Sequence, residues 1–446
     1  MHRKSTLFTL VSAALSVGVA PQALAAGFAL HEQGASGLGN AYAGAAAAAE
    51  DATTVWWNPA GMARLAPGKH FSLGGTYIAP STTFNNGASV PAALSNPAKT
   101  GSGGDAGQNK FVPSAFFATD VTPEWNFGVG ITVPFGLATK YDSDWIGRFQ
   151  GVESKVETVN VNPVFSYKAS EHVSLGGGIS YQEGKIDLLS AVNYSVIAFS
   201  AGGAGALGAV GGPGVEGQNK TTLSGHAWGY NFGLLFDLAR ATRVGIHYRS
   251  SLSYTLQGST SFSNRPALLA AGLPDSDVQL NLKTPDSLAF SAVHQFNERW
   301  QLLADATLTR WSTIQQLPLV RTSGTQSGAT LDTLTFNFRD VWRYSAGASC
   351  QMSSALRLKA GIAYDQAPVP DAATRSVRLP DQDRTWFAIG AAYQFRPRDK
   401  VDLGYSYVTV KDADINNNQT ASGKGIVNGT YSATIHLFGV QYQHTF

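Results

Sequence analysis

The chain has little charge, one cysteine and no long apolar run in its main part. Only 14% of its 446 residues are charged, against about 25% in soluble globular domains. The cysteine, Cys350, has no partner for a disulfide. After residue 25, no stretch reaches the roughly 18 consecutive apolar residues that a membrane-spanning helix needs. These shortages exclude a helical inner-membrane protein and are unusual for a soluble enzyme.

Signatures of catalysis, metal binding and nucleic-acid binding are also missing. The histidines lack metal-ligand spacing, there is no Gly-x-Ser-x-Gly elbow, and the glycine-rich tract 202–214 lacks the Lys-Ser/Thr pair of a phosphate loop. The net charge of +2 is dispersed and forms no basic footprint. We therefore expect no enzyme activity, cofactor, metal or nucleic-acid partner. An outer-membrane protease or phospholipase is the enzymatic alternative, because catalytic residues need not be adjacent in sequence.

Glycine and aromatic residues are abundant instead, with 48 Gly, 23 Phe, 16 Tyr and 9 Trp. From His70 onward, apolar and polar residues alternate with a period of two, the pattern of strands with two different faces. Trp342 and Tyr344 share one such face, and Arg343 and Ser345 share the other. Lipid-facing and lumen-facing residues alternate in this way in outer-membrane β-barrels, whose aromatic residues collect at the membrane interfaces.

Residues 1–25 have the parts of a secretory signal peptide. A basic start at residues 2–4 precedes an apolar run at residues 7–20 and a small-residue site at residues 23–25. The apolar run is too short to span a bilayer. We expect cleavage after Ala25, so that the mature chain begins Ala26-Gly27-Phe28.

The alternating segments predict fourteen strands. They begin near His70, Phe111, Trp125, Lys155, Val173, Thr221, Thr242, Val278, Trp300, Arg339, Ala355, Arg384, Val401 and Gly429. Short connections lie at 122–124, 170–172, 239–240, 297–299, 352–354 and 396–399, and long ones at 81–110, 134–151, 190–220, 258–277, 313–332, 366–383 and 412–428. Bacterial outer-membrane barrels have an even strand number, short periplasmic turns and long extracellular loops. We expect an all-β, transmembrane antiparallel barrel over residues 68–446.

Residues 26–67 do not alternate. The segment is rich in glycine and alanine, and roughly 40 residues without a strand pattern are too many for a simple terminal tail in a compact fold. It either stays outside as a periplasmic tail or folds into the lumen as a plug, as in other plugged barrels.

Several longer motifs are distributed over nearly the whole mature chain. They are Gly27-Phe28-Ala29-Leu30-His31-Glu32-Gln33, Gly37-Leu38-Gly39-Asn40-Ala41-Tyr42-Ala43-Gly44, Glu50-Asp51, Trp57-Asn58-Pro59-Ala60-Gly61, Asp144-Trp145-Ile146-Gly147-Arg148-Phe149, Asn160-Val161-Asn162-Pro163, Asp340-Val341-Trp342-Arg343 and Leu379-Pro380-Asp381-Gln382-Asp383-Arg384. Together they resemble the FadL family of outer-membrane transporters for long-chain fatty acids and aromatic hydrocarbons. The resemblance implies a fourteen-stranded barrel with a small N-terminal hatch at residues 26–67. It also implies ligand capture at hydrophobic extracellular loops and lateral release through the wall at the third strand.

By motif order, the lateral opening falls at Val133-Pro134-Phe135-Gly136. The residues themselves favour a break there, because Pro134 lacks a ladder donor and Gly136 weakens strand pairing. Pro134 could instead simply end a strand where a loop begins.

Asn58-Pro59-Ala60 is the expected latch of the hatch. Asn58 can hydrogen-bond neighbouring backbone, and Pro59 fixes its own dihedral and restrains the residue before it. An ordinary turn or helix start is the alternative.

Two predicted loops carry apolar clusters suited to ligand capture. Phe199 lies in the loop 190–220, and Leu268 and Leu269 lie in the loop 258–277. Exposed apolar clusters are costly unless they bind something or pack on each other. Mutual packing and ligand contact both remain open.

The alternation of faces along the strands predicts that several arginines point into the lumen. They are Arg243, Arg249, Arg339, Arg343 and Arg384. Arginine suits a carboxylate by bidentate pairing, so one could hold a fatty-acid head group, while most would pair with hatch acids such as Glu32, Glu50 or Asp51 or with one another. The expected ligand entry and binding residues are Ala26, Gly27, Phe28, Phe199, Leu268, Leu269 and Arg343.

We therefore expect a passive uptake channel for hydrophobic compounds in the bacterial outer membrane, with long-chain fatty acids ahead of monoaromatic hydrocarbons. Its other partners would be outer-membrane lipid, lipopolysaccharide and the outer-membrane assembly machinery, and it would act as a monomer. A general porin is one rival and would need an open polar lumen. A surface adhesin is another and would bring in no ligand.

Overall fold

The computed structural model describes residues 27–446, so the expected signal peptide and Ala26 lie outside the described residues. Within this range the chain is mostly β-strand, with short helices near its start and in the loops. No helix between residues 27 and 446 is long and apolar enough to cross a membrane.

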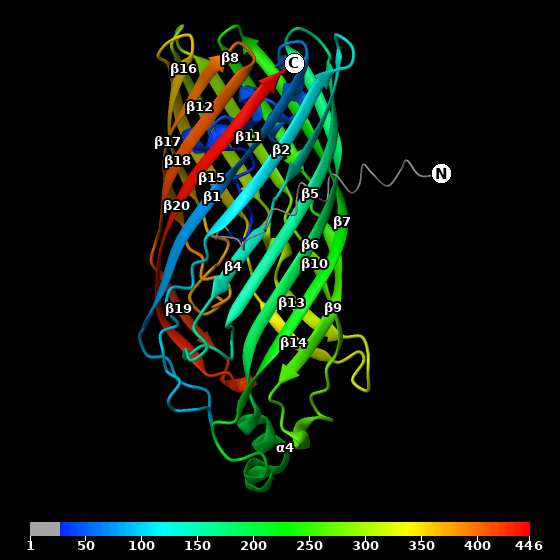
Figure 1. The fold of residues 1–446 in the computed structure, drawn as a ribbon, viewed down its shortest axis with the longest axis vertical. Coiled ribbons are helices and arrows are strands. Elements are labelled where there is room, and N and C mark those ends of the chain that lie inside the picture. Colours follow the sequence, from blue (N-terminus) through cyan, green and yellow to red (C-terminus); the bar gives the residue numbers. More distant parts are fainter. Residues whose placement is uncertain (1–26) are drawn as a thin grey trace, which may run out of the picture.

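The strands form one closed antiparallel barrel (Figure 1). They are β1 (Lys69–Asn86), β2 (Lys110–Asp120), β3 (Trp125–Thr132), β4 (Gly136–Lys140), β5 (Glu153–Lys168), β6 (Val173–Asn193), β7 (Glu216–Ala239), β8 (Thr242–Arg249), β9 (Ser253–Ser263), β10 (Ser276–Lys283), β11 (Ser287–Gln295), β12 (Trp300–Thr309), β13 (Gln316–Arg321), β14 (Thr330–Thr335), β15 (Val341–Gln351), β16 (Leu356–Asp365), β17 (Arg384–Arg396), β18 (Asp399–Val410), β19 (Ala413–Asn418) and β20 (Ile426–Thr445). β1 pairs with β20 along almost its whole length, which closes the ring. Six passes of the wall are interrupted and consist of two strands each, so the twenty strands make fourteen passes and confirm the predicted number.

Four wall strands lie where the sequence predicted loops. β4 falls in the predicted loop 134–151, β13 and β14 begin in the loop 313–332, and β19 falls in the loop 412–428. The expectation of plain loops there was wrong. Each of these strands is six residues or fewer and is separated from the rest of its pass by a break, so its alternation is too short to stand out.

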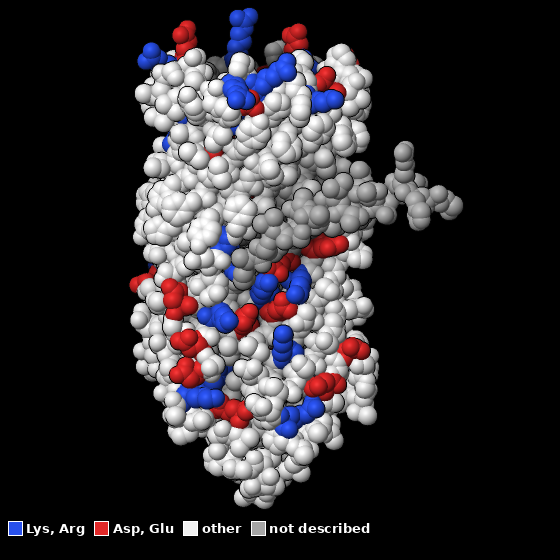
Figure 2. Space-filling view, in the orientation of Figure 1, with Lys and Arg blue, Asp and Glu red and all other residues white. Residues whose placement is uncertain are grey.

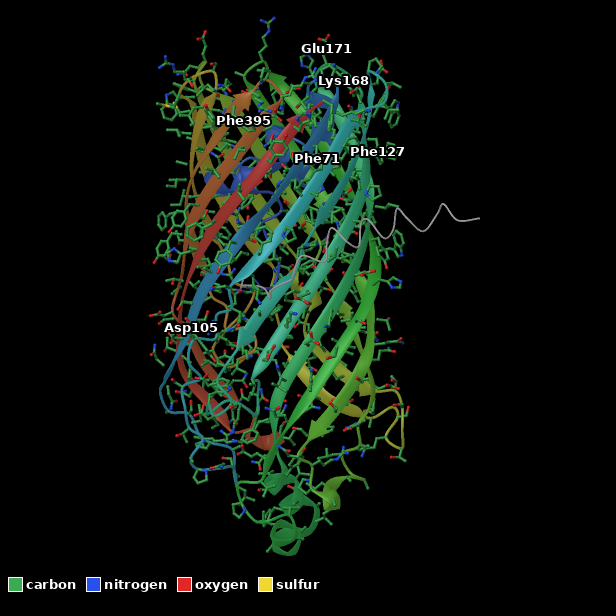
Figure 3. All side chains as sticks on the ribbon, in the orientation of Figure 1. Phe71, Asp105, Phe127, Lys168, Glu171 and Phe395 are labelled. Atoms are coloured by element: carbon green, nitrogen blue, oxygen red, sulfur yellow. The ribbon has the colours of Figure 1, made fainter. Side chains whose placement is uncertain are left out.

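The outer face of the barrel carries an apolar band with aromatic side chains. Figure 3 places Phe71, Phe127 and Phe395 near the end with the short turns, where Lys168 and Glu171 mark the rim. On the face in Figure 2, little charge interrupts the surface between this rim and a mixed field of charged side chains nearer the long loops. A low-charge zone of this kind suits the hydrocarbon core of an outer membrane.

The predicted faces hold for the strand around Trp342. Tyr344 is 47% exposed on the outer face, whereas Arg343 is only 4% exposed on the inner one. The free cysteine, Cys350, is half-buried in the same strand.

Residues 27–65 run inside the barrel before the chain enters the wall (dark blue in Figure 1). They form η1 (Ala35–Asn40), α2 (Ala45–Ala48), α3 (Thr54–Trp57) and η2 (Pro59–Arg64). Wall glycines make room for them: a Cβ at Gly361 would lie 2.3 Å from the backbone of Asn40, and one at Gly245 would lie 1.9 Å from the carbonyl oxygen of Ala46. The assignment of residues 26–67 as a hatch domain stays a prediction.

The long loops of the described chain add three short 3-10 helices and one longer helix, α4 (Tyr194–Ala209), which is kinked at Gly202 and Gly203. The short ones are η3 (Ala267–Leu269), η4 (Trp311–Thr313) and η5 (Thr420–Ser422). α4 lies at the tip of the molecule, at the end opposite the C-terminus (Figure 1).

Candidate functional site: a gap in the wall beside an apolar interior

The third pass of the barrel is broken between β3 and β4. Its pairing with β5 stops at Thr132↔Asn160 and resumes at Gly136↔Glu157. Residues 133–135 therefore face only two residues of β5. Because the strand resumes at Gly136, Pro134 does not end the pass where a loop begins.

The other edge of this pass is open over the same stretch. β2 pairs with β3 only from Ala115 to Asp120, and in the described chain no ladder joins residues 110–114 to β4. Farther out, the loop before β2 closes the wall again, because Gly107 bridges Thr139 and the amide of Lys140 donates to the carbonyl of Ala106 at 3.1 Å. We call this bounded gap, between residues 110–114 and residues 133–138, the window.

The kinked residues bond inward to the start of the chain instead of across the window. The amide of Leu30 donates to the carbonyl of Pro134, and the amide of Gly136 donates to the carbonyl of Phe28, both at 2.8 Å. The Gln33 side chain donates to the Val133 carbonyl at 2.6 Å and accepts from the Val133 amide at 3.0 Å. The start of the chain thus serves as an additional partner for the kinked residues.

The side chain of Thr158 in β5 makes the hydrogen bonds to Phe135 that backbone groups of β5 would make in a regular ladder. Its hydroxyl accepts from the amide of Phe135 at 2.9 Å and donates to the carbonyl of the same residue at 2.7 Å. Sequence reasoning singled out neither Thr158 nor Gln33 for this position. Only Gln33 carried a signal, as the last residue of a family-like motif.

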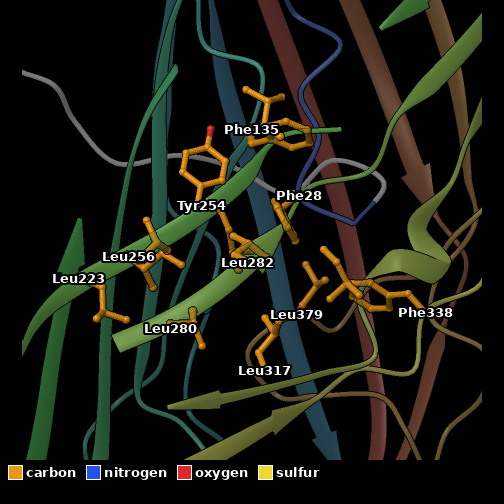
Figure 4. Packing of buried hydrophobic residues seen from close by; sticks show 14 of the residues in the cluster. Phe28, Phe135, Leu223, Tyr254, Leu256, Leu280, Leu282, Leu317, Phe338 and Leu379 are labelled. Carbon is orange, nitrogen blue, oxygen red and sulfur yellow. The ribbon is translucent and has the colours of Figure 1, made fainter. Parts of the chain in front are cut away.

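An apolar cluster fills the interior between the kink and the long loops. Its first members are Phe28 and Phe135, whose rings lie 4.8 Å and 6.4 Å from the ring of Trp311 and 5.7 Å from each other. Figure 4 shows side chains from the neighbouring strands β7, β9, β10 and β13 and from two loops gathered at this interior, namely Leu223, Tyr254, Leu256, Leu280, Leu282, Leu317, Phe338 and Leu379. Such a lining suits a molecule with a large apolar surface.

Gly27 fixes the start of the described chain against this cluster. Its amide donates to Asp381 Oδ2 at 2.7 Å, and Asp381 pairs with Arg384. Its φ is +60°, and a Cβ there would lie 2.6 Å from the Trp311 ring, so only glycine fits without a shift. Burial raises the pKa of Asp381, and the Arg384 charge acts in the opposite direction.

A cavity of about 110 Å³ lies between the N-terminal segment and the wall, beside Pro134. Two of the predicted lumen arginines line it. Arg343 donates to the carbonyl of Ala41 at 2.8 Å, and its Nε has no hydrogen-bond partner in the described chain. Arg249 lies 3.5 Å over the Trp56 ring and donates to the carbonyl of Trp56 at 3.0 Å.

In residues 27–446 none of the five lumen arginines pairs with a hatch acid or with another of the five, so the expectation that most of them would do so was wrong. Arg343 and Arg249 each donate one bond to a carbonyl group of the N-terminal segment instead. The alternation of faces could not predict this partner, because it specifies only which face a side chain lies on. Arg243 pairs with Asp237, Arg339 donates to Ala367 and Arg384 pairs with Asp381.

Glu50 finds its partners on β16. It lies 2.9 Å from Arg357 and 3.2 Å from Lys359, which in turn lies 3.2 Å from Asp402. Burial alone would raise the pKa of Glu50, but Lys359 and Arg357 hold it at about 2. Asp51 accepts from Gln443 at 2.8 Å. These contacts tie the N-terminal segment to the wall near the short turns.

Asn58 is fully buried and uses its whole side chain. Its Oδ1 accepts from the amide of Ala60 at 3.1 Å, while its Nδ2 donates to the carbonyls of Ala46 at 2.7 Å and of Leu234 in β7 at 2.9 Å. Pro59 follows as the first residue of η2. The tripeptide therefore caps a helix and bonds the N-terminal segment to the wall.

Of the three predicted capture residues in the loops, one is buried and two are exposed. Leu269 is buried in a cluster with Tyr194 and Ala198 of α4, whereas Phe199 and Leu268 are 50% and 56% exposed. The two loops thus pack on each other and still leave apolar side chains facing outward.

A family profile described as "Outer membrane protein transport protein (OMPP1/FadL/TodX)" matches residues 16–446. The chain belongs to the FadL family. The long-chain fatty acid transport protein of Escherichia coli K12 is 31% identical over 99% of this chain and 100% of its own length. Outer membrane protein P1 of Haemophilus influenzae is 30% identical over 95% of each chain.

Solved structures agree with this membership. A FadL homologue from Pseudomonas aeruginosa has a TM-score of 0.86 and 26% identity, and covers 94% of this chain and 100% of its own. The toluene transporter TbuX from Ralstonia pickettii has a TM-score of 0.68, and its 19% identity supports the fold alone. This FadL-family chain is an outer-membrane protein of a transport family, not an enzyme.

Proposed function

We propose that this FadL-family protein takes up hydrophobic compounds passively across the outer membrane, with long-chain fatty acids as its main cargo. The observation that carries the proposal is the apolar cluster that reaches the window beside Phe28 and Phe135. The names of the full-length relatives favour fatty acids over monoaromatic hydrocarbons. Transport needs no energy source if binding is strong enough for entry and weak enough for exit.

Cargo would follow a path from the loops to the side of the barrel. Phe199, Leu268 and Leu269 would capture it, because exposed apolar side chains gain free energy by covering apolar surface. It would then displace water from the apolar cluster, contact Phe28 and leave sideways through the window at 133–136.

The start of the chain and Arg343 complete the proposed ligand site. Gly27 contacts the Trp311 ring and Phe28 belongs to the cluster, and Ala26 is proposed with them from the sequence alone. Arg343 lines a cavity next to the kink, and within residues 27–446 its Nε has no hydrogen-bond partner, so we propose it as the group that receives a carboxylate there.

We propose residues 26–67 as a hatch that closes the lumen, with Asn58-Pro59-Ala60 as its latch. The bonds from Asn58 to Leu234 and from Glu50 to Lys359 would hold it in place. A filled lumen speaks against a general porin. The protein is expected to act as a monomer, in contact with lipid and lipopolysaccharide, after insertion by the outer-membrane assembly machinery.

Growth tests would decide the cargo. A strain with this protein as its only such transporter should grow on oleate and poorly on toluene. The reverse preference would favour monoaromatic hydrocarbons. Cell-surface attachment with growth on neither would favour an adhesin.

A deletion would test the lateral route. Removing residues 133–136 joins Thr132 directly to Leu137 and so removes the kink, which should abolish uptake while heat-modifiable folding and external ligand binding persist. Removing residues 324–327 from a long loop is the control of equal length and should leave uptake intact. Uptake at the wild-type rate without residues 133–136 would refute lateral release.

A further inference from the structure

The two sides of the window differ in chemistry. On one side, the outer face of β1 and β2 is apolar, with Tyr77 and Phe111 exposed by 41% and 49%. On the other side, Lys155 pairs with Glu157 at 2.8 Å and Lys140 lies 3.9 Å from Glu153. The window therefore opens between an apolar edge and a charged edge.

This difference matches the level of the window in the wall. Along β5, Lys155 and Glu157 precede the exposed Val159 and Phe165, which lie nearer the short turn at the end of the strand. The break in pairing lies opposite this change, between Asn160 and Glu157. On the face in Figure 2, charged side chains likewise begin below a zone of little charge. Since charge on the lipid face is tolerated only near the membrane interfaces, the window opens where hydrocarbon meets head groups.

Among the three lysines at the window in residues 27–446, Lys110 is the one without a carboxylate within 4.0 Å. It begins β2 at the edge of the window and is only 1% exposed, with its side chain on the same face of the strand as buried Val112 and Ser114. Lys140 and Lys155 each have a glutamate as partner, and Asp105, on the loop that closes the window, accepts from Ser81, Thr82 and Gly107, so Lys110 keeps its charge for another ligand.

We propose that Lys110 is an exit subsite for the ionised carboxylate of an amphiphilic cargo. This inference rests on the proposed uptake of fatty acids through the window. A fatty acid that passes here needs its tail in the apolar band and its charged head at the interface, and the apolar and charged edges match these two ends. Lys110 offers the head group a charge-assisted hydrogen bond during exit. A neutral hydrocarbon or alcohol gains nothing from it.

Paired cargoes would test this subsite. The probes are oleate and oleyl alcohol, which share a chain and differ in head-group charge, and the readout is the ratio of their uptake rates in intact cells. The Lys110→Met variant should lower the oleate to oleyl alcohol ratio on the order of tenfold, the scale of one lost charge-assisted bond. Lys110→Arg should keep most of the ratio.

Lys185→Met is the matched control, because Lys185 has its own partner, Asp187, at 3.2 Å on β6. It should leave the ratio unchanged. Heat-modifiable migration reports assembly, and Lys110→Gln replaces Lys110→Met if the latter does not assemble.

The outcomes separate the subsite from the proposed function. If the wild-type protein takes up neither probe, the proposed function fails. If it takes up both, and Lys110→Met changes both equally or not at all, only the subsite is overturned. Equal loss would mean that Lys110 supports the wall or binds a lipid phosphate.

Discussion

Asn58 illustrates how one side chain can join two parts of this molecule. Its carbonyl oxygen caps η2, and its amide nitrogen bonds both α2 and the wall strand β7. Because Asn58 is fully buried, water cannot replace a lost partner. The residue therefore ties the position of the N-terminal segment to the wall.

Replacing Asn58 by alanine should weaken this attachment by about 1–3 kcal/mol, since buried carbonyls lose their donor. We expect a partial loss of oleate uptake in cells, smaller than that caused by deleting residues 133–136. Asn58→Asp separates the two roles, because it keeps the oxygen that caps Ala60 and loses the donor to Leu234. Wild-type uptake in both variants would contradict a latch.

Glu50 should make the attachment sensitive to acid. Its pKa is lowered to about 2 by Lys359 and Arg357, so its contribution is fully present above its ordinary value, near 4.5, and is lost as the pH falls toward 2. In planar bilayers, leak conductance of the wild-type protein should rise as the pH drops through this range. Glu50→Gln should leak more already at pH 6 and respond less to acid. Identical pH profiles would show that Glu50 does not hold the segment.

At the scale of elements, the two outer loops that contain α4 and η3 pack against each other and also expose apolar side chains. α4 and η3 meet through Leu269, Tyr194 and Ala198, while Phe199 and Leu268 face outward. Mutual packing of the loops and contact with a ligand are therefore compatible, because Leu269 packs between the loops while Phe199 and Leu268 stay exposed.

Aspartate at both Phe199 and Leu268 should reduce capture of oleate. Each buried apolar side chain is worth roughly 1.5–3 kcal/mol, so the apparent affinity should fall by about tenfold or more. External loops tolerate charge, so the barrel should still assemble. Leu269→Asp is the contrasting variant and should disturb loop packing, seen as faster proteolysis of the loops. Unchanged capture by the double variant would mean that the exposed residues do not bind cargo.

At the scale of the whole molecule, a closed wall surrounds a segment that crosses its interior. Removing residues 26–67 should raise nonspecific conductance in planar bilayers, because a fourteen-pass barrel without this filling leaves room for water. Heat-modifiable migration of the shortened chain would check that the barrel still forms. Unchanged conductance would place the segment outside the conducting path and refute the hatch.

The sequence alone determined the barrel, its fourteen passes, the six short turns and the faces of strands such as the one around Trp342. These features are local, because alternation with a period of two is written into each strand and repeated along the chain. The order of the FadL-like motifs along the chain predicted the break at residues 133–136, where the structure interrupts the pairing with β5. The missing amide hydrogen of Pro134 favoured the same position.

Tertiary structure alone decided what meets across the interior. Gln33 bonds Val133 one hundred residues away, and Glu50 meets Lys359 more than three hundred residues away. The alternation within a strand predicts which side chains face the lumen, but it does not predict which residues they contact there. Those contacts depend on the tilt and register of the strands, which set the residues that lie at the same height in the barrel. For this reason the partner of Arg343, the role of Thr158 and the position of Lys110 at the edge of the window became visible only in the folded barrel.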